Sequence, residues 1–153
     1  MAVAESLTGG LLSAALSRST GASKTFRGGL VVYATDLKTT LAGVPQPLLD
    51  AQGPVSTDVA AALARGVRHR LDADLGIGIT GVAGPDPVGE LPPGTVFMAV
   101  AGEGVGEVIR ADLTGSRAEI REAAVTAALR ALAAVLDRLG EPGIPLPHSS
   151  VTP

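Results

Sequence analysis

The chain has 153 residues, a net charge of −3 and 46% hydrophobic residues, enough for one domain with its own core. Low aromatic content and few clustered basic residues argue against a nucleic-acid-binding face, and the absence of cysteine excludes disulfides and thiolate metal sites. No apolar run has the length of a membrane span and the first residues lack a signal-peptide pattern, so we expect a cytoplasmic protein with a small-molecule substrate.

A short apolar strand, a serine and a glycine pair open the chain. Residues 1–4 predict the strand, Ser6 follows it, and apolar residues at helical spacing predict a helix from about Thr8 to Arg18. This arrangement places Ser6 at the carboxyl edge of a strand, beside helical N–H groups that suit a phosphate or a developing oxyanion. Taken alone, the same stretch is more often an ordinary helix cap.

A second strand is predicted over residues 26–33, where a glycine pair leads into a β-branched run. Asp36 can begin a short helix that continues through Leu41. The chain's single tyrosine, Tyr33, and one of its two lysines, Lys38, therefore lie where this strand ends.

The remainder of the chain alternates helices and strands up to a Pro-rich end. The expected elements are a helix over 57–71, a strand over 74–80, a hairpin of strands at 94–101 and 105–113, and a helix over 116–139. Between the strand and the hairpin lie a glycine-rich loop and a Pro/Gly-rich surface excursion. We expect one domain over residues 1–140 and a disordered Pro-rich tail over 141–153.

These elements predict an α/β fold, a three-layer α/β/α sandwich with a mixed, mostly parallel sheet. Ligands of such sheets bind outside the carboxyl ends of the strands. The sequence places three polar or glycine-rich segments at that edge, namely Ser6, residues 33–38 and residues 80–84.

A serine hydroxyl needs a neighbouring base to become a nucleophile. The two histidines are poorly placed for that role, because His69 lies between arginines on an amphipathic helix and His148 lies in the expected tail. Lys38 can act as the base once burial lowers its pKa, and Tyr33 can face the same cleft. The spacing alone fits equally well a half-buried Tyr33 and a solvated Lys38.

Other motifs are weaker. The chain contains no phosphate-binding P-loop, no dinucleotide-binding glycine fingerprint and no cluster with metal-ligand spacing, so we expect no cofactor and no metal. Arg117 and Arg121 lie one helical turn apart and can hold a carboxylate or phosphate, although such a pair is more often a solvated helix face.

Several motifs, in this order along the chain, resemble the CinA C-terminal domain family. They are AESLTGG (4–10), FRGG (26–29) with Tyr33 and Lys38, GPVS (53–56), TGVAGP (80–85) and GTV (94–96). The resemblance spans the chain to about residue 139. It implies an α/β/α fold, nicotinamide mononucleotide deamidase activity and a homodimer or higher homo-oligomer.

The resemblance also implies roles for individual residues. The family's nucleophile corresponds to Ser6 and its Tyr and Lys partners to Tyr33 and Lys38, with N–H groups near Thr8 and Gly9 expected to stabilise the oxyanion. The residues expected to contact the pyridine mononucleotide are Glu5, Thr8, Gly9, Gly10, Thr80, Gly81, Gly84 and Arg121. Two alternatives remain open: a nucleotide-binding or regulatory module without turnover, and an amidase for another small amide.

Overall fold

The computed structural model describes residues 1–140, and the predicted tail over 141–153 lies outside the described residues. The strands are β1 (Ala2–Glu5), β2 (Gly28–Val31), β3 (Gly76–Gly81), β4 (Thr95–Gly102) and β5 (Val105–Asp112). The α-helices are α1 (Leu11–Ser17), α2 (Thr35–Thr40), α3 (Gln46–Gln52), α4 (Thr57–Arg70) and α5 (Arg117–Leu139), with a 3₁₀ helix, η1, at Ala22–Lys24. Within residues 1–140, no helix is long and apolar enough to cross a membrane.

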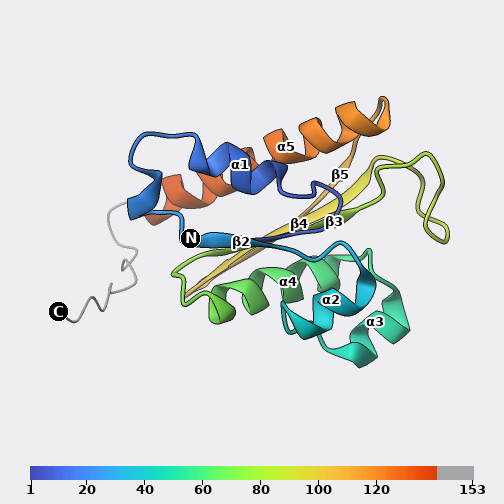
Figure 1. Ribbon diagram of the computed structural model, residues 1–153, viewed down its shortest axis with the longest axis horizontal. Coiled ribbons are helices and arrows are strands. Elements are labelled where there is room, and N and C mark those ends of the chain that lie inside the picture. Colours follow the sequence, from blue (N-terminus) through green and yellow to red (C-terminus); the bar gives the residue numbers. More distant parts are fainter. Residues whose placement is uncertain (141–153) are drawn as a thin grey trace.

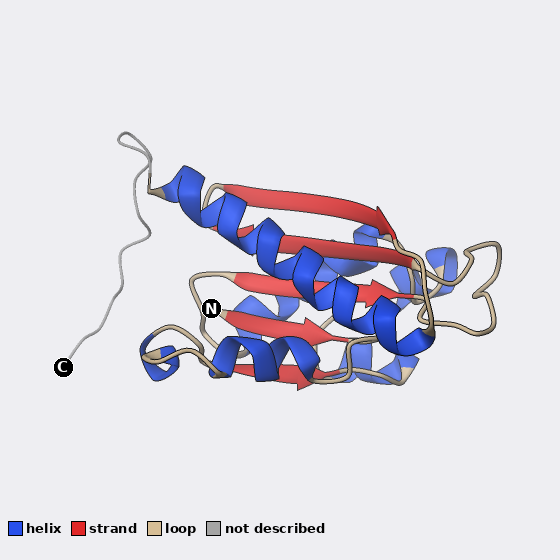
Figure 2. Cartoon of the chain, turned by 90° about the horizontal axis from the view of Figure 1, so that it is seen from above, coloured by secondary structure: helices blue, strands red, loops and turns tan. Residues whose placement is uncertain are grey.

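The five strands form one sheet in the order β2-β1-β3-β4-β5 (Figure 2). Strand β1 pairs in parallel with both β2 and β3, whereas β3 with β4 and β4 with β5 pair in antiparallel orientation. The antiparallel β4–β5 pair is the hairpin expected from the sequence. The predicted mixed sheet is therefore confirmed.

Helices cover both faces of the sheet, as Figure 1 shows: α1 and α5 lie on one face, and α2, α3 and α4 lie on the other. The alternation of side chains along β1 matches this arrangement, because Val3 joins the core beneath α5 while Ala2 and Ala4 join the core beneath α4. The three-layer α/β/α architecture predicted from the sequence is therefore confirmed.

Two glycines of β3 let helix α4 pack directly on the sheet. A Cβ atom added to Gly78 would lie 2.3 Å from the carbonyl oxygen of Ala60, and one added to Gly76 would lie 2.0 Å from that of Ala64. Only a residue without a side chain permits this close approach of helix and strand. The next residue of β3 to face this side, Thr80, donates its hydroxyl to the carbonyl of Pro54 at 2.8 Å and so fixes the loop before α4.

The carboxyl ends of the three parallel strands meet at one edge of the sheet. In the register, Glu5 at the end of β1 lies opposite Val31 of β2 and Ile79 of β3. The N–H of Ser6 still donates to the carbonyl of Ile79 at 3.0 Å, so the chain leaves the sheet immediately after Ser6. The segments that follow these strands therefore converge around Ser6.

Candidate active site

The loop that carries Ser6 is a tight turn between β1 and α1. Helix α1 begins at Leu11, three residues later than the sequence predicted, because Gly9 and Gly10 adopt left-handed conformations with φ of 57° and 100°. These two glycines turn the chain sharply between strand and helix. The turn leaves Ser6 largely buried, with 9% of its surface exposed.

Glu5 holds the first turn of α1 in place. Its fully buried carboxylate accepts hydrogen bonds from the N–H groups of Gly10, Leu12 and Ser13 at 2.8 to 3.0 Å, and from the Ser13 hydroxyl at 2.6 Å. These groups include N–H donors at the start of α1 that have no partner within the helix. The geometry favours a supporting role for Glu5, whose predicted contact with a substrate stays a prediction.

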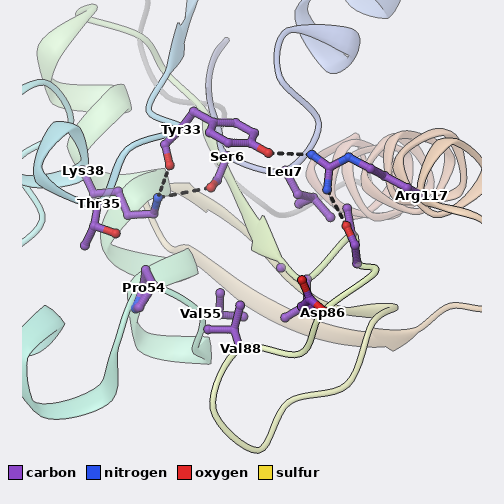
Figure 3. A pocket seen from close by; sticks show the side chains of 14 residues that line it. Ser6, Leu7, Tyr33, Thr35, Lys38, Pro54, Val55, Asp86, Val88 and Arg117 are labelled. Carbon is purple, nitrogen blue, oxygen red and sulfur yellow. Dashed lines mark hydrogen bonds between the residues drawn. The ribbon is translucent and has the colours of Figure 1, made fainter.

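Lys38 reaches Ser6 from helix α2 (Figure 3). Its Nζ lies 3.1 Å from Ser6 Oγ, 2.9 Å from the carbonyl oxygen of Val32 and 3.5 Å from that of Tyr33. The side chain is 1% exposed, and burial lowers the pKa of Lys38 to about 8. The surroundings therefore provide an amine that can give up its proton near neutral pH.

In its neutral form the Lys38 amine has two N–H bonds and one lone pair. The two carbonyl oxygens, of Val32 and Tyr33, offer acceptors for both N–H bonds. The lone pair can then accept the proton of the Ser6 hydroxyl. Serine activation without histidine is therefore chemically possible in this geometry.

The Tyr33 side chain has a different neighbour from the one expected. Its hydroxyl accepts a hydrogen bond from Nη2 of Arg117 at 2.6 Å, while Nη1 of Arg117 donates to the carbonyl of Gly84 at 2.6 Å (Figure 3). Only the backbone carbonyl of Tyr33 contacts Lys38. The structure thus brings Tyr33 to the site as part of its wall, with its hydroxyl directed to Arg117.

A cavity of about 210 Å³ opens beside Ser6 and Lys38. The other lining residues come from the loop after β1, the end of β2, the start of α2, the loop before α4, the end of β3, the loop after it and the start of α5. They are Leu7, Tyr33, Thr35, Pro54, Val55, Gly81, Val82, Ala83, Gly84, Asp86, Val88 and Arg117. Gly81 and Gly84 therefore lie at the cavity, and their contact with a substrate stays a prediction. The cavity combines apolar walls with three charged residues, Lys38, Asp86 and Arg117.

Backbone amides near Ser6 are candidates for an oxyanion hole. The N–H of Gly9 is already bonded to the carbonyl of Ser6 at 3.1 Å, so the expected use of Gly9 as a donor does not fit this structure. The N–H groups of Leu7 and Thr8 have no acceptor among residues 1–140. These two amides directly follow Ser6 in the chain and are candidate donors to an oxyanion.

Four other predicted binding residues contact the protein itself rather than the cavity. Arg121 donates to the carbonyl oxygens of Leu7 and Thr8, both at 2.9 Å, and the Thr80 hydroxyl donates to Pro54. Gly9 and Gly10 form the turn described above. The contact of these residues with a substrate stays a prediction.

No group of three or more His, Cys, Asp or Glu side chains that could hold a metal ion occurs among the described residues. The polar side chains that line the cavity include those of Ser6 and Lys38.

A model of the CinA C-terminal domain matches residues 1–136. The chain belongs to this family.

Relatives and solved structures agree with this assignment. Proteins named CinA-like protein from Gemmatimonas aurantiaca and Frankia casuarinae are 49% and 51% identical to this chain over 130 residues. The alignments cover 84% of this chain and 30% of each relative, so the chain spans about 30% of the length of these curated relatives.

Two crystal structures show how closely the fold is shared. The competence-damaged protein (CinA) superfamily protein from Enterobacter cloacae matches with a TM-score of 0.85 and 32% identity, over 88% of this chain and 80% of that one. The competence/damage inducible protein CihA from Agrobacterium tumefaciens matches with a TM-score of 0.83 and 35% identity, over 88% and 84%. The family and fold predicted from the motifs are confirmed.

In this CinA-family domain the sequence predicted substrate contact for Arg121 and not for Arg117, whereas the structure places Arg117 at the cavity. Both arginines lie on the same face of α5, so their spacing cannot show which one reaches the cavity. A signal was nevertheless present, because Arg117 directly follows Ser116, whose side chain caps α5. Residues in the first turn of a helix lie next to the loops at that end of the sheet.

Proposed function

We propose that this CinA-family domain is a serine amidohydrolase that converts nicotinamide mononucleotide to nicotinate mononucleotide and ammonia. The observation that carries the proposal is the buried pair of Lys38 and Ser6, with 3.1 Å between Nζ and Oγ, at the wall of a cavity. An apolar residue at position 38 would pack at a lower cost in stability than a buried lysine with a pKa of about 8. Its placement is explained if it moves a proton.

Acylation begins when the neutral Lys38 amine takes the proton of the Ser6 hydroxyl as Oγ bonds to the carboxamide carbon. The electrons of the C=O π bond move to oxygen, giving a tetrahedral alkoxide. The free N–H groups of Leu7 and Thr8 are the donors we assign to this oxyanion. When the C=O bond re-forms, the C–N bond breaks, the leaving nitrogen takes the proton from Lys38, and ammonia departs.

Deacylation uses Lys38 and Ser6 again, with water as the nucleophile and Ser6 as the leaving group. Water transfers a proton to Lys38 as its oxygen attacks the ester carbon, and a second tetrahedral alkoxide forms. Collapse of this species breaks the bond to Ser6 Oγ, which regains its proton from Lys38. The sum of both steps is one amide and one water converted to one carboxylic acid and one ammonia.

The charges around the cavity support a pyridine mononucleotide as the substrate. Asp86 supplies a carboxylate that suits the positive pyridinium ring, and Arg117 supplies a guanidinium that suits a phosphate. Apolar residues such as Val55 and Val82 offer surface to a flat ring. A ligand with one positive ring and one negative group matches this lining.

A direct test measures ammonia release from nicotinamide mononucleotide by the wild type, Ser6→Ala and Lys38→Met, with Lys24→Met as the matched control. Lys24 is the other lysine of the chain and is exposed on η1. We expect activity in the wild type and in Lys24→Met, and loss of at least about 1000-fold in the other two. If calorimetry shows that the folded wild type binds the nucleotide and no ammonia is released, the binding-module alternative is established instead.

The amidase alternative has its own measurement. Nicotinamide riboside, nicotinamide and acetamide differ from the mononucleotide by successive loss of phosphate, ribose and ring. The proposal requires a higher kcat/KM for the mononucleotide than for any of these amides. A higher value for an amide without phosphate would identify another substrate class.

A further inference from the structure

The loop that carries Ser6 is held from two sides by charged side chains. Glu5 accepts hydrogen bonds from N–H groups that follow the loop, whereas Arg121 of α5 donates hydrogen bonds to carbonyl groups within it. The Thr8 side chain adds no anchor, since its buried Oγ1 has no hydrogen-bond partner among the described residues. Two backbone hydrogen bonds also close the loop, from the N–H of Gly9 to the carbonyl of Ser6 and from that of Leu11 to the carbonyl of Thr8. Among the described residues, however, Arg121 is the only donor to the carbonyl of Leu7, so the orientation of that peptide depends on Arg121.

Arg121 binds two successive peptide groups at once. Its Nε donates to the carbonyl of Leu7 and its Nη2 to the carbonyl of Thr8, each at 2.9 Å. A guanidinium can do this because its donors have a fixed planar geometry. Gly9 leaves room for the contact, as a Cβ atom there would lie 3.1 Å from Nη2.

Fixing a carbonyl also fixes the amide on the other side of the same peptide bond. The Leu7–Thr8 peptide is trans, so its N–H, which belongs to Thr8, points away from the carbonyl that Arg121 holds. The hydrogen bond to that carbonyl also polarises the peptide group and strengthens the N–H as a donor. The carbonyl of this peptide belongs to Leu7, which lines the cavity, and its N–H has no acceptor among residues 1–140.

We propose that Arg121 is a positioning residue for acylation, which fixes the Leu7–Thr8 peptide so that the Thr8 N–H is presented to the oxyanion. The proposal rests on the proposed serine amidohydrolase function. It gives Arg121 a role different from substrate binding. Arg117, one turn earlier on the same helix, lines the cavity and is the arginine placed to contact a ligand.

The two arginines provide a matched comparison. Arg121→Gln should lower kcat for nicotinamide mononucleotide by about 10- to 100-fold with little change in KM, because misplacing a donor affects the transition state. Arg117→Gln should mainly raise KM. Arg121→Lys keeps the charge and can reach one carbonyl, so it should recover part of the lost kcat. Arg130→Gln, an exposed site on the same helix, should match the wild type.

A second readout separates this inference from the choice of substrate. Acylation of Ser6 by p-nitrophenyl acetate passes through the same kind of oxyanion, so the burst of p-nitrophenol should slow in Arg121→Gln and not in Arg130→Gln. If the wild type gives this burst but releases no ammonia from the mononucleotide, the proposed substrate is wrong and the role of Arg121 stands. A wild type that acylates with neither compound overturns both proposals.

The inference about Arg121 can also fail alone. An Arg121→Gln variant that raises KM at unchanged kcat overturns it in favour of substrate binding. An unchanged acylation burst in folded Arg121→Gln also overturns the proposed role of Arg121. A purely structural role would lower the melting temperature while leaving kcat of the folded protein at the wild-type value, which also contradicts the proposal.

Discussion

Lys38 Nζ and Ser6 Oγ lie 3.1 Å apart, although 32 positions separate the two residues in the sequence. The sheet creates this proximity, because Ser6 follows β1 and Lys38 lies on α2, just after the neighbouring parallel strand β2. Lys38 is 1% exposed, and among residues 1–140 its hydrogen-bond partners are one hydroxyl and two carbonyls, with no carboxylate. Such an arrangement costs stability and lowers the pKa of the amine, so that part of it is unprotonated and able to accept a proton near neutral pH.

The first prediction concerns the pH dependence of activity. Burial lowers the pKa of Lys38 to about 8, and the proposed mechanism requires its neutral form. The value of kcat/KM should therefore rise with pH and level off above about pH 8.5, with a value at pH 6 about 50-fold below that at pH 8. Ammonia release measured from pH 6 to 9.5 checks this. A flat profile over that range contradicts the role of Lys38 as base.

The second prediction concerns the pH dependence of stability. The change in the pKa of Lys38 from 10.5 to about 8 corresponds to a penalty on the order of 3 kcal/mol for the protonated folded state. Below pH 8 this penalty is fully present, since the folded and unfolded chains are both protonated. Between pH 8 and 10.5 the unfolded chain still holds the proton that the folded chain has lost, so the folded state gains stability as pH rises.

Comparison with Lys38→Met isolates this effect, because most other titrating groups are common to both proteins. The free energy of unfolding of the wild type, minus that of Lys38→Met, should rise by about 1 kcal/mol per pH unit between pH 8 and 10. Urea titrations at pH 7, 8, 9 and 10 provide the measurement. A difference that stays constant with pH would show that Lys38 titrates normally.

Much of the site follows from strand order alone, which explains why the sequence could predict it. Ser6 and Lys38 each come after a strand with an apolar, β-branched or small-residue pattern, and parallel neighbours bring such ends together. The helix α3 was not predicted from the sequence, and its first turn contains Pro47. Pro47 is in fact compatible with the first turn of a helix, where its missing N–H has no intrahelical partner.

The sequence could not predict the direction in which individual side chains of the site point. The family resemblance implied that Glu5 contacts the substrate, whereas its carboxylate turns back to the start of α1. Arg117 and Arg121 are equivalent by helical spacing, and their difference arises from where α5 begins relative to the loops after β1 and β3. Such choices depend on tertiary packing.

The third prediction tests the contact between β3 and α4. Gly78→Ala places a methyl group 2.3 Å from the carbonyl oxygen of Ala60, so α4 must shift away from the sheet. We expect a loss of about 2 to 3 kcal/mol in the free energy of unfolding. Gly106→Ala on the edge strand β5 is the matched control, because no atom lies within 4 Å of an added Cβ atom there. Equal effects of the two substitutions in urea titrations would contradict this description of the packing.

The last prediction compares two buried threonine hydroxyls on adjacent strands. Thr80 and Thr95 are 0% and 1% exposed. Among the described residues, the hydroxyl of Thr80 has a partner, the carbonyl of Pro54 at 2.8 Å, whereas that of Thr95 has none. Thr95→Val should raise the free energy of unfolding by about 1 kcal/mol, because it replaces an unpaired buried hydroxyl with a methyl group of similar size. Thr80→Val should lower it by about 1 to 2 kcal/mol, because it leaves the Pro54 carbonyl unpaired.

The same pair reports on the cavity, since Pro54 lines it and Thr95 does not. Releasing Pro54 in Thr80→Val should raise KM for the nucleotide, whereas Thr95→Val should leave KM unchanged. Thermal unfolding gives the stability of each variant, and steady-state kinetics give its KM. If Thr80→Val is as stable as the wild type but binds the nucleotide more weakly, the hydroxyl of Thr80 contacts the substrate directly, and its bond to Pro54 is not what matters.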